Sequence, residues 1–219
     1  LDLYCWHMGV KLTSVANSTT LANLAQVFVV AGAWLLFRET PRRLFLVGLA
    51  LALGGVWAMA AAKGGGGQGA SPFWGDIVSL GAAVWYAGYI LVVHRARADL
   101  GPLRIMIWTS LISAPLLLAA SLGTHERFLP VSAVGWLACL ALGVVHAVSQ
   151  GAIAWALGRV PAATASVVML LQPVFAALLG WLILAEALVP MQAAGGLAAL
   201  AGVALAQFAA ARKPRAESA

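Results

Sequence analysis

The sequence predicts an all-α integral membrane protein, because it is rich in apolar residues, poor in charge and divided into long apolar runs. Of its 219 residues, 63% are hydrophobic and only 9% are charged. A soluble domain has about 45–50% apolar and about 25% charged residues. A chain with so little charge cannot cover a surface that faces water, so lipid is its expected solvent. Spans of a β-barrel would alternate apolar and polar residues, and no segment of the chain does so.

The apolar runs give the expected order of helices. A helix needs about 20 apolar residues to cross a bilayer. An eighth segment, 1–13, comes first and reads like the middle of a helix, so we expect a truncated span there. Prolines lie near most of the expected helix starts, where the missing N–H has no cost. The seven full-length segments are 15–37, 42–62, 73–94, 103–122, 132–157, 162–185 and 190–211.

Positive charge is unequally divided between the two sides that these spans define. The net charge is +6, but the basic residues lie in short gaps between spans and not in a patch, so they indicate membrane topology and not nucleic-acid binding. One side receives Lys11, Lys63 and Arg127. The excess on the other side predicts that it is cytoplasmic and that the C-terminus lies inside. That side receives Arg38, Arg42, Arg43, Arg95, Arg97, Arg104, Arg159, Arg212, Lys213 and Arg215.

An internal repeat relates the two ends of the chain. Residues 15–59 align without a gap with residues 162–206, at an offset of 147, and share twelve identities that include Trp34 with Trp181 and Glu39 with Glu186. Composition alone would give roughly half as many identities. Five predicted helices separate the starts of the copies, so the copies should cross the membrane in opposite directions. Inverted repeats are typical of secondary transporters.

Residues along both halves of the chain follow, in order and spacing, the pattern of a known family. In the first half these are Trp6, His7, Leu12–Asn17, Leu21–Leu24, Arg38, Glu39 and Gly48. In the second half they are Gly75, Asp76, Trp85, Tyr86, Leu157, Arg159–Ala162, Gln172–Val174, Gly180, Trp181, Glu186, Gln192 and Gly195. Taken together, they resemble an EamA-type transporter of the drug/metabolite transporter (DMT) superfamily.

The resemblance implies a bundle of ten transmembrane helices in two inverted repeats, of which this chain would carry eight, the first one truncated. Residues 1–62 would then be the last three helices of the first repeat, 63–72 a flexible linker, 73–211 the complete second repeat and 212–219 a basic cytoplasmic tail. The family usually has proline at the position of Gln26, whereas the second copy keeps Pro173. The sequence therefore gives no reason to expect a backbone kink at that depth in the first copy.

The implied function is secondary transport, in the export direction, of small organic metabolites such as amino acids across the plasma (inner) membrane, with protons as a candidate coupling ion. A non-transporting structural or sensory subunit is the alternative. We expect no enzyme, because no nucleophile–base pair and no metal-ligand spacing is present. We expect no cofactor and no metal, and no phosphate-binding loop suggests drive by ATP.

A central cavity between the repeats is the predicted site, because a solute that crosses the midplane must exchange its hydration for protein groups. His146 and Gln150 share one helix face, and a titrating imidazole could bind an anionic solute and couple to protons. Packing is the alternative role for both. The stripe Asn17, Thr20, Asn23 and Gln26 could likewise hold helices together or line the path. The predicted wall consists of His7, Asn23, Trp85, Tyr89, His146, Gln150, Trp155 and Gln172.

Overall fold

A computed structural model of the chain describes residues 2–62, 71–123, 129–184 and 189–211. The predicted linker 63–72 and tail 212–219 therefore lie almost wholly outside the described residues. Among these residues, seven helical stretches are long and apolar enough to cross a membrane, and they confirm the seven predicted spans within a few residues at each end. The helices are α1 (Asp2–Leu12), α2 (Val15–Ala22), α3 (Ala25–Phe37), α4 (Arg43–Ala62), α5 (Pro72–Ala96), α6 (Pro102–Gly123), α7 (Ala133–Leu157), α8 (Ala162–Met169), α9 (Gln172–Leu184) and α10 (Pro190–Ala211).

The chain divides into two compact units, which we describe separately. Unit 1 comprises Leu1–Leu91 and Pro161–Ala219, and unit 2 comprises Val92–Val160. Unit 1 therefore contains α1 to α4, most of α5, and α8 to α10. Unit 2 contains the last turn of α5 with α6 and α7. The division of the sequence into two EamA repeats is a different division, and it stays a prediction.

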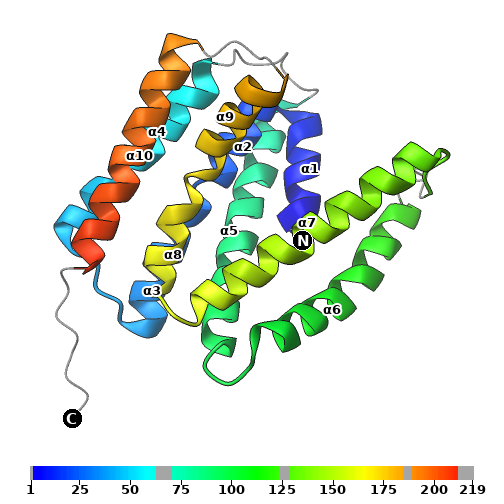
Figure 1. Ribbon diagram of the computed structural model, residues 1–219, viewed down its shortest axis with the longest axis horizontal. Helices are drawn as coiled ribbons and strands as arrows, with labels where there is room; N and C mark the ends of the chain where they lie inside the picture. The colour runs from blue at the N-terminus through cyan, green and yellow to red at the C-terminus, as the bar shows by residue number, and fades with distance from the viewer. Residues whose placement is uncertain (1, 63–70, 124–128, 185–188, 212–219) are drawn as a thin grey trace. The chain divides into compact units, whose positions relative to one another are not determined.

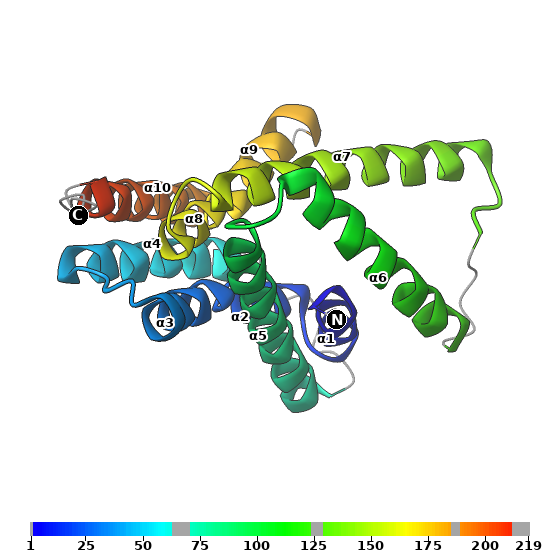
Figure 2. The same ribbon diagram turned by 90° about the horizontal axis from the view of Figure 1, so that it is seen from below.

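Helices α4 and α10 lie side by side in unit 1 and approach each other through glycine (Figures 1 and 2). A Cβ atom placed on Gly48 would lie 2.7 Å from the carbonyl oxygen of Gly202. One placed on Gly55 would lie 2.5 Å from the carbonyl oxygen of Gly195. Real Cβ atoms do not come this close to backbone, so only glycine allows the two helices to pack at this distance.

The same contacts show that α4 and α10 are antiparallel and related by a pseudo-two-fold axis. Gly48 contacts Gly202 and Gly55 contacts Gly195, so the residue numbers of the contacts increase along α4 while they decrease along α10. The colours of Figure 1 run in opposite directions along the two helices for the same reason. At the repeat offset of 147, Gly48 corresponds to Gly195 and Gly55 to Gly202. Each contact therefore occurs twice, and the predicted opposite orientation is confirmed for this pair.

Two spans are interrupted at equivalent positions of the repeat. Residues 23–24 separate α2 from α3, and residues 170–171, at the offset of 147, separate α8 from α9. Both interruptions are 3₁₀ turns, in which an N–H bonds to the carbonyl three residues back: Leu24 to Leu21 at 3.0 Å and Leu170 to Val167 at 3.1 Å.

The first interruption corrects the expectation that we drew from Gln26. A kink occurs there although proline is absent. The Nδ2 atom of Asn23 donates to the carbonyl oxygen of Thr19 at 2.9 Å and shares this acceptor with the Asn23 backbone N–H, which lies 3.1 Å from it. In the second copy, Pro173 cannot donate a backbone hydrogen bond at all. The equivalent interruptions thus occur beside different residues.

We predict that Gly55→Ala destabilises unit 1 by about 1–3 kcal/mol, because the added methyl group must push the backbone of α10 away. Gly54→Ala is the matched control, since nothing lies within 4 Å of a Cβ on Gly54. Alanine there should be neutral or stabilising by up to about 1 kcal/mol. Unfolding of the detergent-solubilised protein measures both. Equal stability of the two variants would contradict the close contact.

Candidate functional site

A pair of tyrosines on α5 includes one, Tyr86, that contacts the second helix interruption inside unit 1. The Tyr86 hydroxyl donates to the Sδ atom of Met169, the last residue of α8, at 3.5 Å. The Tyr86 and Tyr89 rings are stacked, with centroids 6.2 Å apart and planes at 21°. The Asp2 carboxylate on α1 lies close enough to act electrostatically on both phenols. We call Asp2, Tyr86, Tyr89 and Met169 the tyrosine cluster. It brings aromatic, polar and charged groups to a break in a membrane helix.

Small residues position α1, and therefore Asp2, against α5. A Cβ atom on Gly9 would lie 2.2 Å from the Ser79 hydroxyl, so α1 and α5 are in close contact at this point. The Ser79 hydroxyl also contacts Ser18 of α2, at 2.9 Å between the two oxygens. All three residues are buried. Buried serine and glycine at helix crossings are typical of membrane bundles, so this set is structural.

A carboxylate outside α8 caps its N-terminus. Pro161, the N-cap residue, makes no side-chain capping bond. Instead, Glu39, in the loop after α3, accepts hydrogen bonds from the backbone N–H groups of Ala162 at 3.3 Å and Ala163 at 3.4 Å. The carboxylate also lies at the positive end of the helix dipole. Glu39 therefore fixes the start of α8, whose last residue belongs to the tyrosine cluster.

One buried amide in unit 1 has an oxygen with no partner. Gln26 lies in the first turn of α3 and is 3% exposed. Among the described residues, its Oε1 atom accepts no hydrogen bond. An unsatisfied polar atom costs free energy in a membrane interior. Gln26 is therefore a candidate to accept a hydrogen bond from a polar solute. The other end of its predicted polar stripe, Asn17, is exposed.

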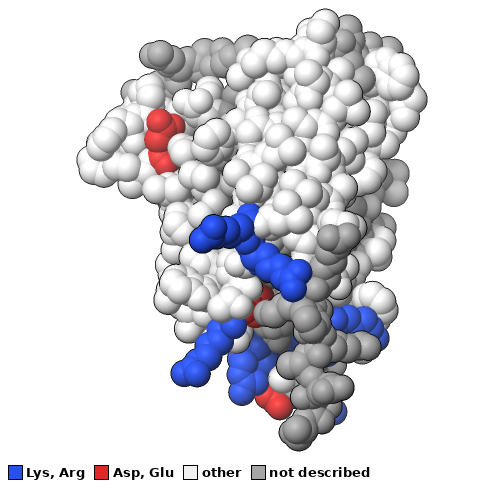
Figure 3. All heavy atoms as spheres, turned by 90° about the vertical axis from the view of Figure 1, so that its left-hand side faces the viewer, with Lys and Arg blue, Asp and Glu red and all other residues white. Residues whose placement is uncertain are grey.

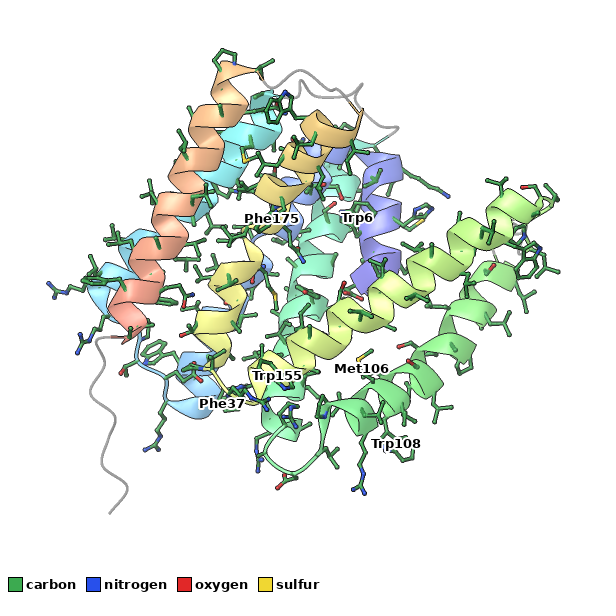
Figure 4. The ribbon with its side chains drawn as sticks, viewed as in Figure 1. Trp6, Phe37, Met106, Trp108, Trp155 and Phe175 are labelled. Atoms are coloured by element: carbon green, nitrogen blue, oxygen red, sulfur yellow. The ribbon has the colours of Figure 1, made fainter. Side chains whose placement is uncertain are left out.

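Unit 2 contains three of the predicted site residues, all on α7. His146 and Gln150 lie one turn apart, as their spacing predicts. Trp155 lies under the guanidinium of Arg159, whose Cζ atom is 3.7 Å from the ring centroid. Trp155 and Met106 also line a groove of about 540 Å³ between α6 and α7 (Figure 4). This contact of Trp155 with Arg159 is local to unit 2.

The family is decided by comparison with known proteins. The sequence profile of the EamA-like transporter family matches residues 2–61 and 73–208. The chain belongs to the EamA-like transporter family. It is therefore a multi-pass membrane transporter of the DMT type. A solved structure titled "Crystal structure of protein" has the same fold, with a TM-score of 0.82 at 20% identity over 94% of this chain and 73% of that one. No curated protein matches the sequence.

Within this EamA-like transporter, the predicted site residues are divided between the units. His7, Asn23, Trp85, Tyr89 and Gln172 belong to unit 1, and His146, Gln150 and Trp155 belong to unit 2. Their assembly into one cavity stays a prediction. Of those in unit 1, Tyr89 belongs to the tyrosine cluster. Gln172 begins α9 beside the helix interruption, and Asn23 lies in the other interruption, where its Nδ2 bonds locally.

Sequence reasoning did not select Tyr86 or Met169 for the site of this EamA-like transporter. A signal for Tyr86 was present: it lies on the face of α5 whose small residues Ala82, Ala83 and Ala87 are buried. Trp85, which was selected, is one position away from that face and is 54% exposed. No comparable signal marks Met169, because its role depends on a partner 83 residues away.

We predict that Glu39→Ala lowers the stability of this EamA-like transporter by about 0.5–2 kcal/mol, the range for a lost helix cap. Glu39→Gln should cost less, because an amide oxygen still accepts a hydrogen bond. The control is Asp99→Asn, whose carboxylate makes an exposed pair with Arg95 and should contribute little. Unfolding in detergent measures all three. A Glu39→Ala variant as stable as the control would remove the capping role.

Proposed function

We propose that this EamA-like transporter is a secondary exporter of small organic metabolites, such as amino acids, that works by alternating access. The observation that carries the proposal is the pair of helix interruptions at equivalent positions of two inverted segments. Transporters use broken helices to present backbone groups to a solute near the midplane. Here the second interruption adjoins the tyrosine cluster, so polar side chains and a break in the helix occur together in unit 1.

The proposed path residues are those of the sequence prediction together with Tyr86 and Gln26. Aromatic faces and a small number of polar groups are the usual lining of a site for a small organic solute. In the proposal, His146 binds an anionic group of the solute and exchanges a proton during the cycle. Gln150, one turn away, contributes dipoles without charge.

A structural or sensory subunit remains the alternative function, and flux separates it from transport. The full chain is reconstituted in liposomes and tested with a panel of amino acids and related solutes, with and without a pH gradient. We expect flux of at least one solute above that of protein-free liposomes, and acceleration by the gradient if protons are coupled. No flux of any solute in either direction would favour the alternative.

We predict that His146→Ala abolishes most of this flux while expression and folding stay near normal, and that Gln150→Ala has a milder effect. Tyr86→Phe should reduce flux about 2–10-fold, because it removes one hydrogen bond and keeps the ring. Tyr4→Phe is the control, since Tyr4 is exposed on α1. Initial rates at equal reconstituted protein measure the effect. Wild-type rates in the His146 and Gln150 variants would remove this face of α7 from the proposed path.

The proposed orientation places the C-terminus in the cytoplasm of a cell whose plasma (inner) membrane holds the protein. Its support is the excess of basic residues at one set of helix ends. In unit 1 that set includes Arg38 and Arg42, the first and last residues of the loop between α3 and α4.

We predict that a fluorescent protein fused after Ala219 is fluorescent and that alkaline phosphatase fused at the same place is inactive, because the phosphatase folds only outside the cytoplasm. The two fusions are compared at equal expression. The opposite pair of results would reverse the orientation and leave the inverted contact of α4 and α10 unaffected.

A further inference from the structure

A cavity of about 290 Å³ opens in unit 1 where α3 ends, α4 and α8 begin and α10 ends. Most of its wall is apolar, and it includes Phe45 of α4 and the three consecutive alanines Ala209–Ala211 at the end of α10. Arg42, just before α4, adds a permanent positive charge to the wall. An apolar cavity with one cationic group in its wall is suited to bind an amphiphile that carries a negative charge.

The positive charge of Arg42 is not neutralised within the described part of the chain, where it makes no ion pair. The cavity also contains one carboxylate, that of Glu39. Its oxygens accept hydrogen bonds from the backbone N–H groups of Ala162 and Ala163, at the positive end of α8. The Glu39 carboxylate thus faces positive backbone groups at the start of α8, and Arg42 is the group of the wall that can attract an anion.

The arginines at this end are not required by the repeated fold. At the offset of 147, Arg38, Arg42 and Arg43 correspond in sequence to Ala185, Val189 and Pro190. The helix ends recur in the second copy without these charges. Figure 3 shows Lys and Arg side chains in the lower half of the face that it draws. Anionic lipids are enriched in the cytoplasmic leaflet, and basic pockets between membrane helices bind their headgroups.

We infer that this cavity binds part of one anionic phospholipid, with the phosphate beside Arg42 and the start of an acyl chain along Phe45 and the alanines of α10, while the rest of the lipid stays in the bilayer. The lipid contacts the start of α4 from one repeat, and the start of α8 and the end of α10 from the other. It therefore stabilises the same junction that Glu39 caps. The inference depends on membrane embedding and not on the substrate, so transport can fail without affecting it.

The test is lipid binding to the purified full chain in detergent, followed by native mass spectrometry. Phosphatidylglycerol and phosphatidylcholine with identical acyl chains are titrated separately. We expect phosphatidylglycerol to bind at least about fivefold more tightly, as one arginine contributes about 1 kcal/mol to anionic-lipid binding. Arg42→Gln should abolish this preference. Arg43→Gln is the matched control, because Arg43 is the next residue and does not line the cavity; it should keep most of the preference.

A second variant tests the location without changing charge. Ala210→Phe fills the cavity and should weaken binding of both lipids, whereas Ala204→Phe, on an exposed face of α10, should not. Equal losses in Arg42→Gln and Arg43→Gln, or unchanged binding in Ala210→Phe, would overturn the inference. So would competition by inorganic phosphate at the lipid concentration, which would identify a free anion. Tighter lipid binding after removal of residues 212–219 would show that the chain's own basic tail occupies the cavity. That result would also overturn the inference.

Discussion

The close antiparallel contact between α4 and α10 is the constraint on which the rest of unit 1 depends. In lipid, apolar surface alone does not drive helices together, so close packing of small residues must do so. Gly48, Gly55, Gly195 and Gly202 allow backbone to meet backbone. This contact places the start of α4 beside the end of α10. Glu39, in the loop before α4, can then reach the start of α8.

Helix α8 is consequently a short segment that other helices hold along its length. Glu39 caps its first turn, and the amide of Gln207 on α10 donates to the carbonyl oxygen of Thr164 at 3.0 Å. At its end, Met169 accepts from Tyr86. A 3₁₀ turn then joins it to α9. The eight residues of α8 are therefore fixed at both ends and in the middle by contacts with other elements.

Composition and periodicity were sufficient to predict the spans and the opposite orientation of the copies, because lipid acts on the average polarity of long segments. Composition and periodicity were not sufficient to predict contacts between residues that are far apart in the sequence. Glu39 reaches Ala162 across 123 positions, and no local pattern indicates that partner. The interruption beside Asn23 was missed for another reason: a kink was expected only where proline occurs, and this interruption occurs without proline. His146 and Gln150 were predicted from spacing alone, and their role stays open.

The symmetry of the α4–α10 contact has a consequence for how such a chain can diverge. An isologous interface needs only one helix sequence to specify both of its sides, so a single copy paired with its own inverted twin would make the same glycine contacts. In such a dimer every substitution would change both sides of the interface at once. Once both copies share a chain, each side can change alone. The contact records one such change: Gly195 faces Met59, whereas Gly48 faces Ala206 at the equivalent place.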